Sequence, residues 1–454
     1  CIRDSYITEN GNINFTTGSS GNTISSGLAG KGVFAKSGTG ALNLSGVNKD
    51  FEGSMLINDG IVNYVQSNGG SFVGGSVKLA GNTELNIENS SSDNIRNLSS
   101  EDNSSVINKT GNGILNSTGD NSGYTGTVNV SDGELSYTAE DEYSRFFSPQ
   151  AKINLSDGTK LTVDTNSQAG QKGGNISSET NNAQFDKIGA GDFALSGTND
   201  SFTGDLNIKQ GSLTFTKKGT TSFVNGNTNI SNGAALNYIA ESEGSINNLT
   251  NAGKLAKLGD STLTIEDYNF NGGVAEIYEG TLKVLSKSAN AKDFDFKSNI
   301  YENAVLDYVA RGGSGLTLDA SNSNLNFVNA NSNATAMISN ADILLGILNN
   351  SEGNNIILNN SSITPSVGVT DFSGANYTFK NSEFKLMNND INTSDYLFSN
   401  LNVDKSNLTL DVSLGETLGG DTLNIASGSG EFKISGLAIT VSYTHLRAHE
   451  TKAN

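Results

Sequence analysis

Few residues of this chain could carry out chemistry, and their positions limit the reactions open to them. The only two histidines, His445 and His449, lie in the last fourteen residues. Ser-His-Asp and Cys-His arrangements need a histidine base, so neither is available to the rest of the chain. The two histidines stand four residues apart, as paired metal ligands on a helix would, but no carboxylate follows at a zinc-site spacing. We therefore expect no catalytic residue, no metal site and no cofactor.

Carboxylates are the next candidates, since a glycosidase needs two of them facing one sugar. The densest clusters are Glu140-Asp141-Glu142, and Glu241 with Glu243. Adjacent residues on a strand point to opposite faces. We therefore interpret Glu140–Glu142 as part of a solvated loop, with a carbohydrate or Ca²⁺ contact as the alternative.

The segment 139–148 around that acidic cluster also contains aromatic and basic residues. Loops carry recognition while the scaffold stays fixed, and aromatic residues with Arg are favoured at protein contacts. One hypothesis is an adhesive loop. The other is that Phe146 and Phe147 fold back and cover the coil below. The residues of the adhesive hypothesis are Tyr143, Arg145, Phe146 and Phe147.

Four lysines open segments that resemble one another, each with a glycine two residues later, and these units recur every 70 to 78 residues. A second turn glycine follows 21 or 22 residues after the first. Aligned lysines could form a basic row, but lysines three coils apart would be separated by roughly 14 Å, near a Debye length. We therefore expect independent, solvated turns at Lys36, Lys109, Lys187 and Lys257.

Aromatic residues recur at one position of the unit, at Phe51, Tyr124, Phe202 and Phe270. We interpret them as core or turn-packing residues rather than as a binding stripe.

Short strands must position all these residues. Runs of about four to six residues alternate apolar with polar and end at Gly, Asn, Asp or Ser. Self-similarity at a fixed period indicates a solenoid, and about 22 residues suit one coil of a parallel β-helix. We predict an all-β, right-handed parallel β-helix, a rod of order 95 Å. Its core should contain Leu42, Leu44, Leu161, Val163, Leu213, Phe215, Leu282 and Val284.

The composition agrees with this fold class. Hydrophobic residues make up 35% of 454 residues, which suffices for a thin core, and the 2 prolines remove few ladder donors. Asparagine is abundant, and stacked asparagines can form side-chain ladders. A net charge of −19 disfavours nucleic acid as a partner. The single cysteine, Cys1, excludes a disulfide framework within these residues.

Repeat content and composition divide the chain into three parts. These are 1–310 with clear repeats, 311–440 with degenerate coils that could close the helix, and 441–454. The last part breaks the Gly/Asn/Ser texture and resembles translated sequencing-adaptor read-through, so we interpret it as a non-native tail. The chain starts at Cys1 without a basic region or an apolar stretch. We expect a truncated start, at which no signal peptide is visible.

The repeat resembles the autotransporter-associated β-strand repeat of Gram-negative passenger regions. Lys36-Ser37-Gly38-Thr39-Gly40 leads to Leu42-Asn43-Leu44 and then to Phe51-Glu52-Gly53. Lys187-Ile188-Gly189-Ala190-Gly191 leads in the same way to Phe202-Thr203-Gly204. The copy at Lys109 reads Leu115-Asn116-Ser117 in place of Leu-x-Leu, and the copy at Lys257 has Ser261 in place of the second glycine.

This resemblance implies a right-handed β-helical passenger on the surface of a Gram-negative bacterium, at its outer membrane, or secreted. It implies a structural or adhesive role without catalysis, a C-terminal outer-membrane β-barrel translocator that this chain lacks, and binding to a host or neighbouring-cell protein or glycan. Two alternatives remain open: a β-helical polysaccharide lyase or glycoside hydrolase, and a surface-layer or phage-fibre protein. Clustered carboxylates with an arginine in one cleft would favour the enzyme.

Overall fold

The structure is a computed structural model, and it describes residues 5–66, 72–285, 296–318, 325–387, 394–414 and 418–440. The tail 441–454, with His445 and His449, lies outside the described residues. Two compact units are present. Unit 1 comprises Cys1–Ala256 with Asn271–Gly273, and unit 2 comprises Lys257–Phe270 with Val274–Asn454. The division falls within the segment 1–310, and the boundary expected at 310 from repeat content stays a prediction.

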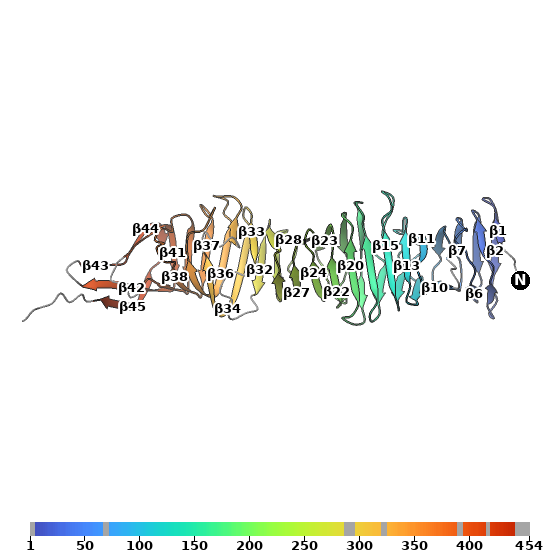
Figure 1. The fold of residues 1–454 in the computed structure, drawn as a ribbon, viewed down its shortest axis with the longest axis horizontal. Helices are drawn as coiled ribbons and strands as arrows, with labels where there is room; N and C mark the ends of the chain where they lie inside the picture. Colours follow the sequence, from blue (N-terminus) through green and yellow to red (C-terminus); the bar gives the residue numbers. More distant parts are fainter. Residues whose placement is uncertain are drawn as a thin grey trace, which may run out of the picture. The chain divides into compact units, whose positions relative to one another are not determined.

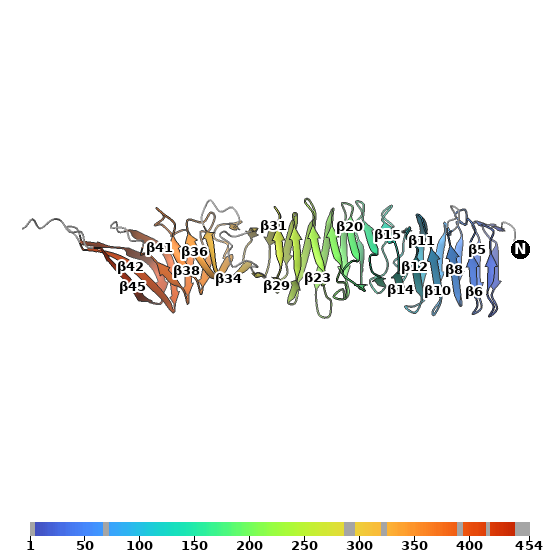
Figure 2. The same cartoon turned by 60° about the horizontal axis from the view of Figure 1, so that its bottom comes forward.

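Unit 1 is a parallel β-solenoid, in which each strand pairs with strands about one coil away in the chain (Figure 1). Several strands of one sheet are labelled in Figure 2. In order, its strands are β3 (Asn22–Ile24), β6 (Ala41–Leu44), β8 (Ile61–Val65), β10 (Glu84–Glu88), β12 (Val106–Thr110), β14 (Thr127–Val130), β16 (Lys152–Leu155) and β19 (Ile176–Ser178).

A longer sheet turns a corner inside one strand. The N-terminal half of β11 (Asp93–Ser100) pairs with β13 (Ile114–Thr118), and its C-terminal half pairs with β9 (Ser76–Leu79). The register shifts between Arg96 and Leu98. Asn97 lies at this corner with φ 50°, a left-handed conformation that asparagine tolerates. The other strands are β2 (Asn12–Thr16), β5 (Val33–Ser37), β7 (Ser54–Ile57), β9 (Ser76–Leu79), β13 (Ile114–Thr118), β15 (Glu134–Thr138), β17 (Lys160–Asp164), β20 (Gln184–Ile188), β22 (Asp205–Ile208), β24 (Asn227–Ile230) and β27 (Asn248–Asn251).

The third sheet of unit 1 contains β18 (Gln171–Gly174), β21 (Asp192–Ser196), β23 (Ser212–Lys217) and β25 (Ala235–Ala240). Shorter strands are β1 (Ser5–Ile7), which pairs with β4 (Leu28–Gly30), and β26 (Gly244–Ile246). β28 (Lys254–Leu258) spans the division between the units, and β30 (Tyr268–Phe270) belongs to unit 2.

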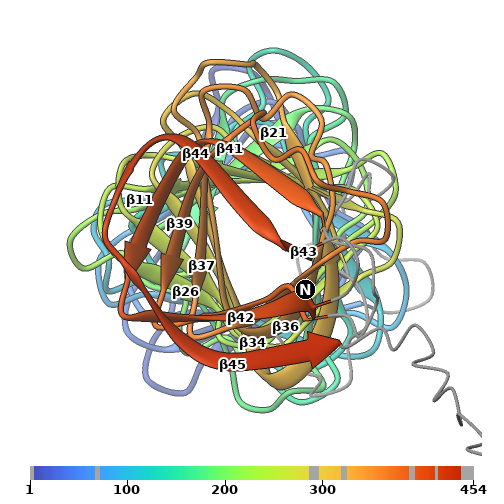
Figure 3. The same ribbon diagram turned by 90° about the vertical axis from the view of Figure 1, so that its left-hand side faces the viewer.

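Unit 2 has the same kind of architecture, with β39 (Asn376–Lys380) beside β37 (Asn355–Asn359) and β45 (Phe432–Thr440) beside β42 (Ser406–Leu414) (Figure 3). Its described pairs are parallel except β42 with β43, which is antiparallel. Its strands are β29 (Thr262–Ile265), β31 (Val274–Ile277), β32 (Thr281–Leu285), β33 (Lys297–Ile300), β34 (Val305–Leu318), β35 (Leu325–Phe327), β36 (Thr335–Leu345), β37 (Asn355–Asn359), β38 (Ser362–Pro365), β39 (Asn376–Lys380), β40 (Glu383–Lys385), β41 (Asp395–Asp404), β42 (Ser406–Leu414), β43 (Leu418–Gly420), β44 (Thr422–Ser429) and β45 (Phe432–Thr440).

Alternation along the strands builds the core of each unit. In unit 1, Leu85, Ile107, Val128 and Ile153 stack in register and are buried. The residues next to them in the chain point outward, as the period of a strand requires. The predicted core set is confirmed, since each member is at most 1% exposed: Leu42, Leu44, Leu161, Val163, Leu213, Phe215, Leu282 and Val284. The predicted parallel β-helix is likewise confirmed.

Candidate functional site

The repeat lysines are buried inside the coils, which contradicts the expected solvated turns. The side chains of Lys36, Lys109, Lys187 and Lys257 have no exposed surface. The ammonium of Lys187 donates hydrogen bonds to the main-chain carbonyls of Ile188 at 3.0 Å, Gly189 at 2.9 Å and Gln210 at 2.9 Å. An ammonium has three N–H donors, so these carbonyls use its whole capacity.

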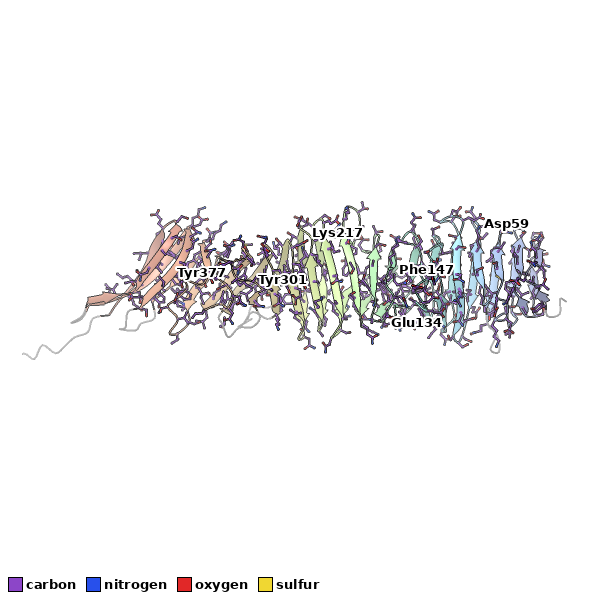
Figure 4. The ribbon with its side chains drawn as sticks, turned by 90° about the horizontal axis from the view of Figure 1, so that it is seen from above. Asp59, Glu134, Phe147, Lys217, Tyr301 and Tyr377 are labelled. Carbon is purple, nitrogen blue, oxygen red and sulfur yellow. The ribbon has the colours of Figure 1, made fainter. Side chains whose placement is uncertain are left out.

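The other three lysines make equivalent contacts. Lys109 donates to the carbonyls of Thr110, Gly111 and Asp132, and Lys257 donates to those of Leu258, Gly259 and Glu279. Lys36 donates to the carbonyls of Gly38 and Asp59, the latter labelled in Figure 4. In every copy one acceptor lies 22 or 23 residues ahead. Each lysine therefore ties its own turn to the turn of the next coil, and we call this arrangement the lysine clip.

The lysine clip explains the two glycine positions of the repeat. Gly38 and Gly60 adopt φ 79° and 70°, a region that residues with a Cβ rarely enter. A Cβ on Gly60 would lie 2.6 Å from Lys36 Nζ and 2.7 Å from the Gly38 carbonyl oxygen. Glycine is therefore required at the second turn both for its backbone conformation and for space beside the ammonium.

Burial lowers the pKa of the lysine ammonium groups. The pKa of Lys187 falls to about 8 because the side chain is desolvated, while the carboxylates of Asp192 and Asp164 act to raise it. Desolvation likewise lowers the pKa of Lys109 and of Lys257 to about 8. Each of these amines donates to main-chain carbonyls of its own turn and of the next coil, so the site supports a structural role rather than a surface contact.

The lysines do not form a row. In register, Lys109 stacks on Ile87, Tyr64 and Leu44, and Leu44 belongs to β6, the strand after the one that carries Lys36. Lys187 stacks on Val163, Tyr137 and Ser117 of β13, the strand after the one that carries Lys109. The repeat is thus about three coils plus one strand long, and each copy in unit 1 moves one strand further around the coil.

A buried asparagine twelve residues after the lysine was missed in the sequence analysis. Asn199 Oδ1 accepts the N–H of Ile176 at 3.0 Å, one coil back. Its Nδ2 donates to the carbonyls of Ser196 at 2.9 Å and Ser222 at 3.0 Å, the latter one coil ahead. Asn48 and Asn121 accept from Leu28 and Leu98 in the same way. Its constant offset from the lysine was the sequence signal that could have found it.

The recurring aromatics are core residues in the three copies of unit 1. Phe51, Tyr124 and Phe202 have no exposed surface. Phe270 of unit 2 is half-buried and packs against Tyr268 and Phe296, with ring centroids 5.9 and 4.7 Å away. The core or turn-packing interpretation is therefore confirmed.

The segment 139–148 combines a buried base with an exposed tip. Phe146 and Phe147 are 1% exposed, and Phe146 packs edge-on against Tyr137 and Phe193, with ring centroids 5.2 and 5.3 Å away. A Cβ on Gly173 would lie 2.3 Å from the Phe146 ring, so glycine makes room for it. Phe147, labelled in Figure 4, contacts Tyr124. These two phenylalanines are packed in the core, which is the arrangement that the second hypothesis describes. Adhesion by this segment stays a prediction.

The tip of this segment is fixed by polar contacts. Buried Gln171 accepts from the hydroxyl of Tyr137 and the N–H of Phe146 and donates to the carbonyl of Ser144. Arg145 is half-buried and donates to the carbonyls of Glu142 and Ser144 of its own turn. Tyr143 is 73% exposed. Glu140–Glu142 are exposed as expected, so an adhesive role would rest on Tyr143 with these acids around it.

Charged groups outside the repeat motif form one ladder across coils. Asp186 is 3% exposed and lies between Lys160 at 3.3 Å and Lys209 at 2.7 Å, while Lys160 also meets Glu134 at 3.4 Å. Burial acts to raise the pKa of Asp186, but hydrogen bonds from Lys209 and Asn207 and the charge of Lys160 hold it below its usual value. Glu134 and Asp186 are thus paired with Lys160 and Lys209 across neighbouring coils.

Two kinds of feature are absent from the described residues. Among them, no group of three or more His, Cys, Asp or Glu side chains is placed to hold a metal ion. In the same part of the chain, no helix has the length and apolar character needed to cross a membrane.

Comparison with known proteins identifies the repeat. The family model of the passenger-associated-transport-repeat matches residues 34–63, 107–136 and 185–215. The fourth copy, at Lys257, lies outside these matches yet makes the same three carbonyl contacts. No curated protein and no solved structure matched the chain. The chain therefore carries passenger-associated-transport repeats within a parallel β-solenoid, and both features fit the passenger region of an autotransporter.

Proposed function

We propose that this chain is a surface-displayed or secreted autotransporter passenger with a structural or adhesive role and without catalysis. The observation that carries the proposal is the recurrence of the transport repeat in a solenoid. The lysine and asparagine side chains of the repeat form hydrogen bonds between neighbouring coils. Such repeats imply an autotransporter context, with a translocator domain as the partner in secretion. The ligand of an adhesive passenger would be a protein or glycan of a host or neighbouring cell.

The segment 139–148 supports adhesion at one place in unit 1. Its base is locked by Phe146, Phe147 and Gln171, so Tyr143 is presented on a preorganised turn. An exposed aromatic residue on a fixed turn binds with little loss of conformational entropy. We propose that Tyr143 contacts the partner, with Arg145 holding the turn in shape.

Beads coated with the purified full chain test this proposal on layers of cultured epithelial cells and of Gram-negative cells. We expect coated beads to adhere and Tyr143→Ser to reduce adhesion severalfold. Tyr6→Ser is the matched control, because Tyr6 is also 73% exposed, and it should leave adhesion unchanged. Equal adhesion of coated and bare beads, or cleavage of polygalacturonate by the chain, would contradict a non-catalytic adhesive role.

A further inference from the structure

A ladder of asparagine amides runs along the outer side of the sheet that contains β6 to β19. Figure 2 labels several strands of this sheet. Each Nδ2 donates at 2.8 Å to the Oδ1 of the asparagine 20 to 25 residues before it, and the hydroxyl of Ser177 donates to the last amide. We call this arrangement the amide ladder. Its members are Asn43, Asn63, Asn86, Asn108, Asn129 and Asn154.

The amide ladder leaves half of the capacity of its amides for other partners. An asparagine amide offers two N–H donors and two acceptor lone pairs, and a ladder contact uses one of each. Asn108 gives its second N–H to Glu84 at 2.8 Å. For Asn129 and Asn154 the structure shows only the ladder contacts, so each keeps one N–H and one lone pair at half-buried positions.

A groove lies over this part of the ladder. It has a volume of about 400 Å³, and its lining includes the three amides of Asn108, Asn129 and Asn154. Ser131 and Ser156 follow the strands that carry Asn129 and Asn154, and Glu179 contributes a carboxylate. Donors and acceptors therefore repeat along the groove at the spacing of neighbouring strands, which is about 4.8 Å.

The chemistry of the groove selects a class of ligand. Amide and hydroxyl groups that offer a donor beside an acceptor match the neighbouring hydroxyls of a sugar. Among the described residues that line the groove, Glu179 is the charged one, and the whole chain carries −19, so an anionic polymer would be repelled. A polymer with a repeating unit can use several rungs at once, which raises its avidity.

We propose that the groove over Asn108, Asn129 and Asn154 binds a neutral polysaccharide that lies along the amide ladder. The proposal rests on the proposed adhesive function and names a ligand class for it. Tyr143 does not line this groove, so the groove proposal and the Tyr143 proposal can each be contradicted without the other.

The test measures binding of the full chain to hydroxyethyl cellulose, yeast mannan and dextran, with polygalacturonate as the anionic counterpart, by affinity electrophoresis and calorimetry. We expect at least one neutral polymer to bind and polygalacturonate not to bind. The double variant Asn129→Ala/Asn154→Ala should weaken binding about tenfold, as the loss of one or two hydrogen bonds predicts. Asn43→Ala/Asn63→Ala removes the same kind of ladder contact without touching a partner of the groove amides, and binding should stay within about twofold of the parent.

Ser131→Trp provides a second test that leaves the ladder intact. Ser131 is exposed at the groove, so the indole should fill the groove and abolish binding without a change in thermal unfolding. The proposal is overturned if none of the neutral polymers binds, if both double variants lose binding equally, or if polygalacturonate binds as well as the neutral polymers. Light scattering that shows self-association, lost in Asn129→Ala/Asn154→Ala, would instead assign the ladder to a second copy.

Bead adhesion separates this proposal from the proposed function. Adhesion of beads coated with the parent chain, when that chain binds none of the neutral polysaccharides, would remove the groove proposal alone. Polysaccharide binding by the chain without adhesion of coated beads would remove the adhesive function alone.

Discussion

Lys109 Nζ donates a hydrogen bond of 2.9 Å to the main-chain carbonyl of Asp132, which lies in the next coil of unit 1. This contact joins the two motifs that the sequence repeats, the lysine turn and the second turn. The spacing between them is therefore the length of one coil.

Lys109→Met should destabilise the chain substantially. The substitution keeps an apolar side chain of similar length but leaves the carbonyls of Thr110, Gly111 and Asp132 without their buried donor. An unsatisfied buried polar group costs roughly 1–3 kcal/mol. We expect a loss of about 2 kcal/mol or more in the free energy of unfolding, measured in denaturant. Lys152→Met, at an exposed position, should stay within about 0.5 kcal/mol of the parent.

Gly133→Ala should cost more than Gly158→Ala. The two glycines have nearly the same backbone conformation, with φ 71° and 70°, so both variants lose stability by forcing alanine into the left-handed region. At Gly133 a Cβ would also lie 2.4 Å from the Gly113 carbonyl oxygen, whereas Gly158 has nothing within 4 Å. Thermal unfolding of both variants measures the difference. Equal losses would mean that close packing against the neighbouring coil is unimportant.

Asn199→Ala should lower stability by about 2 kcal/mol, because it strips partners from three main-chain groups in successive coils. Asn43→Ala, which breaks one exposed ladder contact, is the matched control and should change stability little. Denaturant unfolding followed by circular dichroism would show the contrast. A larger loss at Asn43 than at Asn199 would contradict the structural role assigned to Asn199.

Stability should rise with pH where the lysine clip titrates. The pKa of Lys187 is about 8 in the folded chain and 10.5 in the unfolded chain, so between these values the unfolded state binds more protons. The free energy of unfolding then increases with pH. We expect the stability of the parent relative to Lys187→Met, which cannot titrate there, to rise between pH 8 and pH 10.5. A difference that falls or stays flat would show that the carbonyls keep the ammonium charged.

The fold was predictable because its cause is local and repeated. Alternation at Leu42 and Leu44 fixes which side of β6 faces the core, and every coil repeats that pattern. The repeat spacing likewise predicted the fourth copy at Lys257, where Ser261 replaces a glycine. This copy still forms the lysine clip, because the acceptors of the clip are main-chain carbonyls.

The site was less predictable because composition does not reveal burial. Lysine is charged, and a solvated position is its ordinary state. Only the approach of carbonyls from two coils makes the interior acceptable to Lys187, and that geometry needs the coil register. The shift of one strand between successive copies of the repeat could not be predicted either, because it too depends on the coil register. Phe146 was ambiguous because Gly173, which makes room for its ring, lies one coil away.

Amine labelling of the native chain tests the central claim that the repeat lysines are internal joints between coils. An N-hydroxysuccinimide ester and mass spectrometry would compare native with denatured protein. We predict that Lys36, Lys109, Lys187 and Lys257 resist labelling until the chain unfolds. Lys31, whose side chain is 65% exposed, and the exposed Lys152 should react at once. Equal labelling of the repeat lysines and Lys31 in the native chain would contradict the account.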